Sequence, residues 1–309
     1  MVDKLVLPKR LVFVAVTVMA TAGVAAILLT SAETFTGGSE AENYTDKTDN
    51  VSVLDGAEAS GGSYVTFAAP TDVLPFGHGQ ADGPSGIWTL SFSDEFEGTE
   101  LDANNWTTGW WGTGITQPVQ QQELACYDPA QVTVQDGHLR LEAVERAVTC
   151  GGIERPYSSG AVTSRDKREY TDGYFEARLW LDANDADIYN WPAWWMNGHN
   201  WPTDGELDIM EGLSGDARAT WHGPETMQHA LGNGGPMGGW HVFAAERAAG
   251  KVTAYYDGVR IGSYESATNV TTAPQYLILM QQMAPEDEWG GPVKVPSQML
   301  VDYVRVWQR

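Results

Sequence analysis

The chain has 309 residues, and its 41 Asp and Glu against 18 Lys and Arg give a formal net charge of −23. This balance disfavours nucleic acid and anionic membrane surfaces as partners, because a phosphate backbone is bound by clustered cationic side chains and the basic residues here form no run. With 42% hydrophobic residues and 13 Trp, the chain is too apolar to be wholly disordered. Its 34 Gly and 15 Pro predict many short elements joined by turns.

The first 32 residues have the pattern of an export signal. Lys4, Lys9 and Arg10 precede an uncharged, mostly apolar stretch at 11–32, which is long enough to span a bilayer. Small residues at its end offer a cleavage site. We therefore expect an extracellular protein, either secreted or anchored to the outer face of the membrane by this segment alone. A buried core helix is the less favoured alternative.

Residues 33–85 differ in composition from the rest of the chain. They are rich in Gly, Ser, Thr, Ala and acidic residues, with no sustained helical or strand period. This composition predicts a disordered, charge-extended linker. The folded domain is then expected at 86–309, as a monomer.

Two cysteines, Cys126 and Cys150, lie in the predicted domain. In an exported protein they are expected to form one disulfide, which would close a loop between adjacent strands. A pair of free buried thiols is the alternative.

The domain has the period of β-strands. Apolar and polar residues alternate at 138–144 and 174–181, which predicts half-buried strands. Two further strands, 252–256 and 259–264, flank Asp257-Gly258, a strong hairpin signal, and 300–307 is another. With no convincing long helix, the sequence predicts an all-β fold of two stacked antiparallel sheets.

The most informative segment is 205–211, GELDIME. Strict alternation places Glu206 and Asp208 on one face of a strand and Glu211 on the other. One extra residue, a β-bulge near Ile209 or Met210, would bring all three carboxylates to the same side, and bulges are frequent beside active sites. Paired carboxylates suit a glycosidase with a nucleophile and a proton donor. We expect Asp208 to hold Glu206 ionised and to raise the pKa of Glu211. A solvated acidic strand or a calcium site is the alternative.

Aromatic residues surround this motif. Trp191, Trp194, Trp195 and Trp201 precede it by at most fifteen residues, and flat aromatic rings stack against sugars. Trp194 and Trp195 are neighbours on a predicted strand, so one is expected to face the cleft and the other the core. The segment Thr220-Trp221-His222 is expected to start the next strand, from which His222 could reach the same cleft.

These segments together resemble glycoside hydrolase family 16, in its laminarinase-like branch with the bulged motif. ELDIME has the spacing of that branch, and FSDEF at 92–96, GYFEAR at 173–178 and VDYVRV at 301–306 stand in the family's order. The resemblance implies a two-sheet antiparallel β-jelly-roll sandwich with a concave substrate cleft. It also implies retaining hydrolysis of internal β-linkages, with Glu206 as nucleophile, Glu211 as acid/base and Asp208 as their helper.

The family pattern extends to further positions. It implies sugar contacts, and our candidates are Trp195, Trp201, His222, Trp110, Glu123 and Gln282. It gives no catalytic cofactor, but a structural calcium is often held near the N-terminal acidic motif, for which the candidates are Glu95, the backbone oxygen of Gly137, and Asp302. Departures at 121–127 and 280–283, where subsites are shaped, leave the substrate open. β-1,3-Glucan is favoured, mixed-linkage glucan and β-galactan are alternatives, and sulfated polysaccharides are disfavoured by like charge.

Three functional hypotheses follow. The leading one is an exported endo-β-glycanase acting on a neutral polysaccharide. The others are a transglycosylase, which shares the first chemical step, and a non-catalytic β-glucan-binding protein on the same fold. Residues 86–309 contain 31 acidic and 14 basic residues, of which only three are lysines. This hydrated acidic surface predicts adaptation to high salt, where self-repulsion is screened.

Overall fold

The computed structural model describes residues 51–55, 63–67, 73–225, 228–235, 237–285 and 289–309. The chain divides into two compact units, Met1–Leu74 and Pro75–Arg309. The predicted export or anchor segment at 1–32 lies outside the described residues. Within the described ranges, no helix is long and apolar enough to cross a membrane.

The first unit contains a β-hairpin within the predicted linker. Strands β1 (Val51–Asp55) and β2 (Ser63–Phe67) pair antiparallel, from Val51 opposite Phe67 to Asp55 opposite Ser63. Val51 lies opposite Phe67 and Val53 opposite Val65, and β-branched and aromatic residues of this kind favour strands. The expectation that 33–85 contains no strand is therefore wrong for these ten residues.

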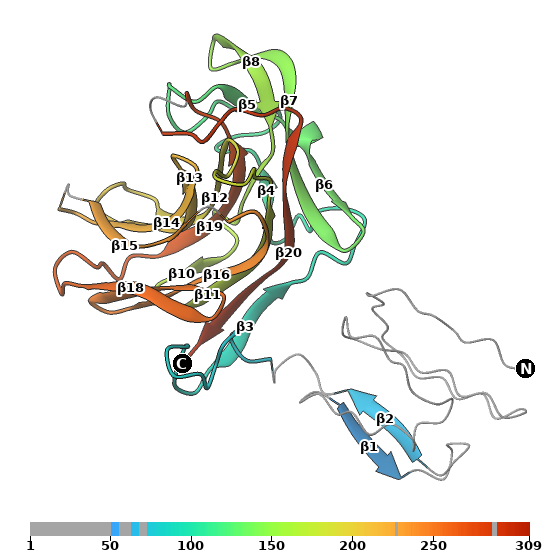
Figure 1. The fold of residues 1–309 in the computed structure, drawn as a ribbon, viewed down its shortest axis with the longest axis vertical. Coiled ribbons are helices and arrows are strands. Elements are labelled where there is room, and N and C mark those ends of the chain that lie inside the picture. The colour runs from blue at the N-terminus through green and yellow to red at the C-terminus, as the bar shows by residue number, and fades with distance from the viewer. Residues whose placement is uncertain (1–50, 56–62, 68–72, 226–227, 236, 286–288) are drawn as a thin grey trace, which may run out of the picture. The chain divides into compact units, whose positions relative to one another are not determined.

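The second unit consists of two sheets stacked face to face (Figure 1). The smaller sheet has the order β15–β14–β13–β12–β19–β9–β4, with β10 paired to β19. Its strands are β4 (Thr107–Thr108), β9 (Ala161–Thr163), β10 (Glu169–Tyr170), β12 (Trp191–Gly198), β13 (Glu206–Leu213), β14 (Asp216–His222), β15 (Gln228–Gly235) and β19 (Gln275–Gln282).

The larger sheet has the order β18–β17–β16–β11–β20–β7–β8–β5, with β3 paired to β20 and β6 to β7. Its strands are β3 (Thr89–Asp94), β5 (Ala125–Tyr127), β6 (Val132–Gln135), β7 (His138–Cys150), β8 (Ile153–Ser159), β11 (Gly173–Leu181), β16 (Gly239–Ala248), β17 (Lys251–Tyr256), β18 (Val259–Glu265) and β20 (Ser297–Gln308). A 3₁₀ turn, Pro129–Gln131, precedes β6. Among the described strands only β5 and β8 pair in parallel, so the predicted all-β fold of two antiparallel sheets is confirmed.

Strand alternation builds the core between the two sheets. On β7, Leu139, Leu141 and Ala143 are fully buried and alternate with partly exposed residues. The predicted hairpin is also present: β17 and β18 are joined by Asp257 and Gly258, both at positive φ, as a two-residue turn of this hand requires. The predicted strands therefore lie where the period-two pattern places them.

The second unit begins earlier than predicted, at Pro75 rather than at residue 86. Its first residues bind the larger sheet. The Phe76 amide donates to the carboxylate of Glu176 on β11 at 2.8 Å, and the Arg260 amide on β18 donates to the carbonyl of Asp82 at 2.8 Å. Composition alone did not reveal this earlier start, because a segment held by backbone hydrogen bonds needs no regular spacing of apolar residues.

Glu176 departs from the alternation predicted for β11, since it is buried rather than on a polar face. It accepts hydrogen bonds from the Phe76 amide and from the Tyr303 hydroxyl, the latter at 2.9 Å. Burial raises the pKa of Glu176 to about 7. The N-terminal segment of the unit therefore covers a face that strand period alone would leave in solvent.

The predicted disulfide joins Cys126 on β5 to Cys150 at the end of β7. The sequence predicted that the disulfide joins adjacent strands, and this is wrong because β8 lies between β5 and β7 in the sheet. The bond links β5 to the β7–β8 hairpin across 24 residues of sequence. It therefore constrains a loop of the unfolded chain that includes three strands.

We expect the double replacement of Cys126 and Cys150 by alanine to lower the free energy of unfolding by about 3 kcal/mol, the chain-entropy value for a loop of this length. Urea denaturation followed by tryptophan fluorescence measures the change. The wild-type protein with its disulfide reduced is the control. An unchanged free energy of unfolding in the double variant would contradict this prediction.

Candidate active site

A β-bulge in β13 brings three carboxylates to one face of the smaller sheet. On the β12 side, Asp208 pairs with Trp195 and Met210 with Trp194, so Ile209 is the extra residue. The pairing of β13 with β14 shifts at the same place, between Asp208 and Glu211. The predicted bulge is confirmed at Ile209.

The core side of β13 shows how the extra residue is accommodated. Leu207, Ile209 and Met210 are all buried in the core between the sheets. Because Ile209 and Met210 are consecutive and both point inward, the residue that follows them returns to the outer face. The three carboxylates of Glu206, Asp208 and Glu211 thus share that face.

The start of β13 is fixed by Gly205. Its φ is +80°, and a Cβ there would lie 2.6 Å from Cη2 of Trp221, a residue buried in the core. Only glycine fits this backbone without moving that indole. The preceding loop contains the cis peptide bond Trp201-Pro202.

The pairing of β13 with β12 and β14 determines which residues lie next to each carboxylate. Glu206 lies opposite Asn197 on β12 and His222 on β14, and Glu211 lies opposite Ala193 and Arg218. His222 Nε2 lies 3.0 Å from Oδ2 of Asp208 and 3.6 Å from Oε1 of Glu206. The predicted reach of His222 into this site is confirmed, although Thr220-Trp221-His222 ends β14 instead of starting it.

Burial dominates the electrostatics of the three carboxylates. It raises the pKa of Asp208 to about 7 and that of Glu211 to about 8, and it raises the pKa of Glu206 well above its usual range. Mutual repulsion adds to this, because the charge on Asp208 raises the pKa of both glutamates. The three groups therefore share protons near neutral pH.

One electrostatic prediction has the wrong sign. We expected Asp208 to hold Glu206 ionised, but a like charge makes ionisation of Glu206 harder. The groups that lower the pKa of Glu206 are His222, through its charge, and Trp201, through an indole hydrogen bond. For Glu211, the Trp191 indole donates to Oε1 at 3.0 Å. An ionised Glu206 is thus favoured when Asp208 is protonated.

Three indoles stack beside the carboxylates. The ring centres of Trp195 and Trp110 lie 5.3 Å apart, with an angle of 13° between the ring planes. The rings of Trp110 and Trp111 have the same separation and the same interplanar angle. Trp194 is buried in the core between the sheets, while Trp195 pairs with Asp208 and belongs to a separate cluster, so the two side chains point to opposite faces as predicted. However, Trp195 and Trp110 are buried, and Trp111 is the member that is 53% exposed.

Exposure therefore changes which indoles can meet a sugar. Trp201, one of the candidates for a sugar contact, is open to solvent, with 59% exposure. Trp111 was missed, although it directly follows Trp110 in a glycine-rich loop. The available signal was the second tryptophan directly beside the one chosen as a candidate.

The sequence is similar to those of known proteins. A model described as "XgeA-like, catalytic GH16 domain" matches residues 184–233, which include β12, β13 and β14. A β-glucanase of Rhodothermus marinus is 30% identical over 256 residues, which is 72% of this chain and 85% of the relative. The chain belongs to glycoside hydrolase family 16.

Solved structures of glucanases have the same fold. A non-specific endo-β-1,3(4)-glucanase of family 16 matches with a TM-score of 0.60 at 27% identity, over 72% of this chain and 91% of that one. The laminarinase catalytic domain of Thermotoga maritima matches with a TM-score of 0.59 at 27% identity, over 72% and 99%. The protein is thus a family 16 glycoside hydrolase with the family's β-jelly roll.

Two further predicted sugar contacts of this family 16 domain are buried. Glu123 is 1% exposed and accepts hydrogen bonds from the Gln120 amide at 2.7 Å and the Tyr127 hydroxyl at 3.3 Å. Gln282 is also buried, and its Oε1 accepts from the amides of Ala125 and Met283. Their polar atoms hold the 120–127 loop against β19, so neither is placed to contact a sugar.

The residues predicted for calcium meet at one stretch of β20. Asp94 pairs with Val304 and Leu139 with Val301, which brings Glu95 and Gly137 close in register to Asp302. Both carboxylates are ion-paired, however.

Glu95 binds Arg305 through two bonds of 2.9 and 2.8 Å, and Asp302 binds Arg178 at 2.7 Å. As placed, this set does not fit calcium, which prefers six to eight oxygen ligands without competing cations. Calcium binding stays a prediction from the resemblance.

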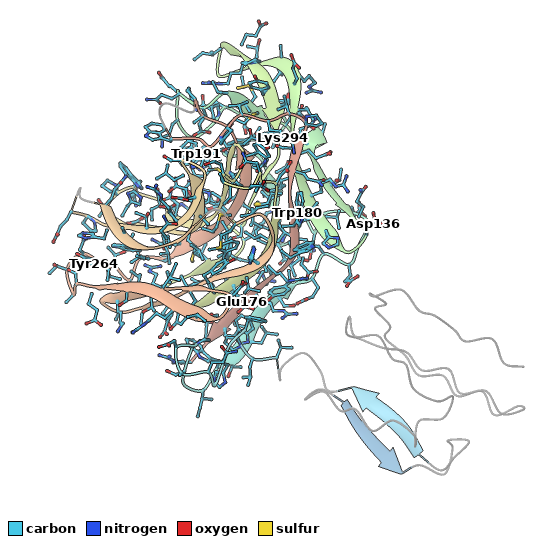
Figure 2. All side chains as sticks on the ribbon, in the orientation of Figure 1. Asp136, Glu176, Trp180, Trp191, Tyr264 and Lys294 are labelled. Atoms are coloured by element: carbon cyan, nitrogen blue, oxygen red, sulfur yellow. A yellow bond between two sulfur atoms is a disulfide. The ribbon has the colours of Figure 1, made fainter. Side chains whose placement is uncertain are left out.

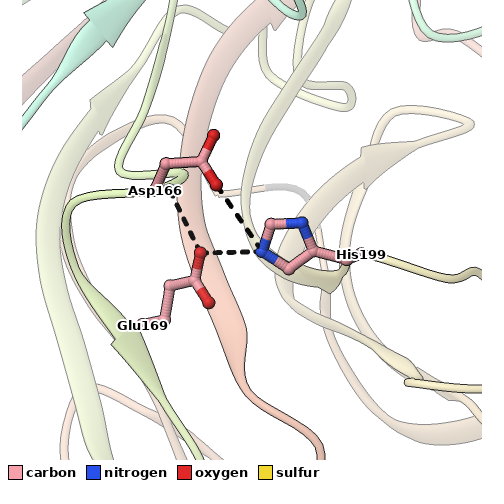
Figure 3. Close-up of side chains that lie close together, drawn as sticks. All are labelled: Asp166, Glu169 and His199. Carbon is pink, nitrogen blue, oxygen red and sulfur yellow. Dashed lines mark hydrogen bonds and ion pairs between the residues drawn. The ribbon is translucent and has the colours of Figure 1, made fainter.

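A second polar cluster was not foreseen. Asp166, Glu169 and His199 meet beside β10, and His199 Nε2 lies 2.8 Å from Oε1 of Glu169 (Figure 3). Arg165 lies 3.3 Å from His199 Nδ1 and 4.6 Å from the centre of the Trp111 ring.

Since arginine only donates, Nδ1 of His199 accepts and its Nε2–H points at Glu169. The cluster is therefore a hydrogen-bonded chain that orients Arg165 beside an exposed indole.

Burial raises the folded-state pKa of Glu123 from 4.5 to about 7. The folded protein binds this proton more tightly than the unfolded chain, so the associated stability is complete below pH 4.5 and is lost as the pH rises towards 7. We expect Glu123→Gln, which cannot ionise, to gain up to about 3 kcal/mol relative to the wild type across this range.

Urea denaturation between pH 4.5 and 7.5 measures the difference, with Glu100→Gln at an exposed position as the matched control. A Glu123→Gln difference that does not change with pH would contradict the burial argument.

Proposed function

We propose that this family 16 enzyme is an exported endo-glycosidase that hydrolyses internal β-1,3 linkages of a neutral glucan with retention of configuration. Glu206 is the nucleophile, Glu211 the acid/base, and Asp208 the group between them. The observation that carries the proposal is the bulge at Ile209, which gives three buried carboxylates a common face. A purely sugar-binding protein needs no such costly arrangement.

The raised pKa of Glu211 suits its proposed role, whereas burial opposes the ionised state that Glu206 needs. With a pKa of about 8, Glu211 is protonated at neutral pH and can donate to the leaving glycosidic oxygen. Glu206 must be ionised to attack the anomeric carbon. His222 and Trp201 favour that state, and a proton on Asp208 removes the nearest repulsion. In the second step Glu211, now ionised, takes a proton from a water molecule, and the oxygen of that water bonds to the anomeric carbon and displaces the carboxylate of Glu206.

The exposed indoles supply surfaces for sugar rings. Trp201 interacts with Glu206, the residue that would bond to the sugar retained by the enzyme, so it lies on the glycone side. The buried Trp191 contacts Glu211, which protonates the leaving group, so it marks the aglycone side without offering a surface to a sugar. Trp111 extends the aromatic surface through its stack with Trp110 and Trp195. A chain that contacts both sides would be cut internally.

The type of linkage and the location of the enzyme are also part of the proposal. The similar proteins include a β-glucanase, an endo-β-1,3(4)-glucanase and a laminarinase, which favours a β-glucan with 1,3 linkages. The acidic site disfavours sulfated chains. Export is inferred from the sequence of residues 1–32, and a disulfide between Cys126 and Cys150 fits an oxidising compartment.

The roles of the two glutamates can be separated by azide rescue on 2,4-dinitrophenyl β-laminaribioside. We expect Glu206→Ala to be restored by azide with formation of the α-glycosyl azide, because azide occupies the position of the nucleophile. Glu211→Ala should form the β-glycosyl azide, because azide then attacks the covalent intermediate. Without azide, the loss of the acid/base should reduce kcat on laminarin about 10²–10⁴-fold.

Product analysis by NMR and by sizing on laminarin, lichenan, agarose and β-1,3-galactan completes the test. Glu206→Gln should cleave none of them. Binding without cleavage by the wild type would replace the enzyme by a binding protein, and products longer than the substrate would indicate transglycosylation. Hydrolysis that survives Glu206→Gln would exclude the proposed nucleophile.

A further inference from the structure

Trp191 makes a contact with the active site that the motif alone does not reveal. It is the first residue of β12, and its side chain is labelled in Figure 2. Its ring is buried, and its Nε1–H donates to Oε1 of Glu211 at 3.0 Å. The contact joins two strands of the same sheet and fixes one oxygen of the carboxylate.

Hydrogen bonds to the segment 292–294 fix both the backbone and the side chain of the residue before Trp191. Asn190 is fully buried with φ +63°, and its amide donates to the carbonyl of Pro292 at 3.0 Å. Its side chain donates to the carbonyl of Lys294 at 2.9 Å and accepts from the Lys294 amide at 2.8 Å. The position of the Trp191 indole is therefore set before any substrate binds.

The other side of the indole is packed by Trp289. The two rings lie 5.6 Å apart at 53°, and the carbonyl of Trp289 accepts from the Ser214 amide at 2.7 Å, beyond the end of β13. Trp289 thus supports the ring of Trp191, while no described hydrogen bond joins it to Glu211. Trp191 both packs and donates to Glu211, whereas Trp289 only packs against Trp191. Substitution of each in turn therefore distinguishes the effect of the hydrogen bond on Glu211 from the effect of packing.

We propose that Trp191 is the positioning residue of Glu211: its indole N–H holds the carboxyl in one orientation and sets the pH at which that group loses its proton. The acid/base role of Glu211 rests on the proposed function, but the hydrogen bond and its effect on the proton do not. A donor to a carboxylate stabilises the ionised form and lowers its pKa. Trp191 thereby limits the increase in the pKa of Glu211 that burial causes.

Several charged or titratable groups also face Glu211 and act on the same proton. Asp208 and Glu206 on β13 raise its pKa by repulsion, while His222 and Arg218 on β14 lower it. Arg218 lies directly opposite Glu211 and is partly exposed, so salt screens its effect. A short buried hydrogen bond is screened much less, which distinguishes the contribution of Trp191 from that of Arg218.

The test is a titration of the protein labelled with ¹³C at the glutamate carboxyl carbons, in which the Glu211 resonance is assigned by its loss in Glu211→Gln. We expect Trp191→Phe to raise the midpoint of Glu211 by about one pH unit, because the ring is kept while the donor is lost. The shift should persist in 0.5 M NaCl. Arg218→Gln should also raise the midpoint, but by less in high salt.

Trp289→Phe is the packing control and should leave the midpoint unchanged. Where the substrate is hydrolysed, Trp191→Phe should also move the alkaline limb of kcat upwards by the same amount, with little change in KM. An unshifted midpoint in Trp191→Phe overturns the proposal, even if hydrolysis is slower, because slower hydrolysis alone is what lost packing would cause. Trp191→Met, which also lacks a donor, serves if the phenylalanine variant does not fold.

The titration needs no substrate, so its outcome is independent of the proposed function. A shifted midpoint in a protein that cleaves no β-glycan would support the role of Trp191 and refute the activity. An unshifted midpoint in an active enzyme would support the proposed activity and refute the role of Trp191.

Discussion

The extra residue in β13 is the constraint on which the site depends. In a regular strand, alternation would bury the carboxylate of Glu211 in the core between the sheets, where an unpaired charge is very costly. Ile209 and Met210 instead both face the core, and the alternation restarts one residue later. The register with β12 and β14 then places His222 and Arg218 beside the carboxylates from one neighbouring strand and Trp195 from the other.

The common face has an electrostatic consequence. Three carboxylates that lose water together cannot all be ionised near neutral pH, and so their environment decides which group keeps a proton. The neighbours differ along the strand: His222 and Trp201 act on Glu206, and Trp191 and Arg218 act on Glu211. Asp208 is coupled to both glutamates by repulsion. The difference between a nucleophile and an acid thus arises from the neighbouring strands and loops more than from the motif itself.

Much of this arrangement could be predicted from the sequence because it depends on strand period. Alternation located the main strands, and the parity of three acidic residues required a bulge between Asp208 and Glu211. The opposite orientations of Trp194 and Trp195 follow from the same rule. The recognisable order of the family segments then supplied the jelly-roll topology, which no local pattern contains.

The predictions that failed depend on loops that cover a face of a sheet. Glu123 and Trp110 belong to the segment between β4 and β5, and its folding buries both them and Trp195. Glu176 is buried because Phe76, from a region that was assigned to the linker, binds over it. The disulfide partners were evident from their number, but the position of β8 between their strands depends on the order of the sheet.

The central claim is that the extra residue Ile209 brings Glu211 to the same face of the strand as Glu206 and Asp208. Changes in the number of residues between Asp208 and Glu211 test this claim most directly. Deletion of Ile209 gives ELDME, in which plain alternation already places all three carboxylates on one face. Deletion of both Ile209 and Met210 gives ELDE, in which alternation places Glu211 on the core side. Measured on laminarin with variants shown by circular dichroism to be folded, the single deletion should retain hydrolysis well above that of Glu211→Gln, whereas the double deletion should not. Equal loss of hydrolysis in both folded variants would contradict the account.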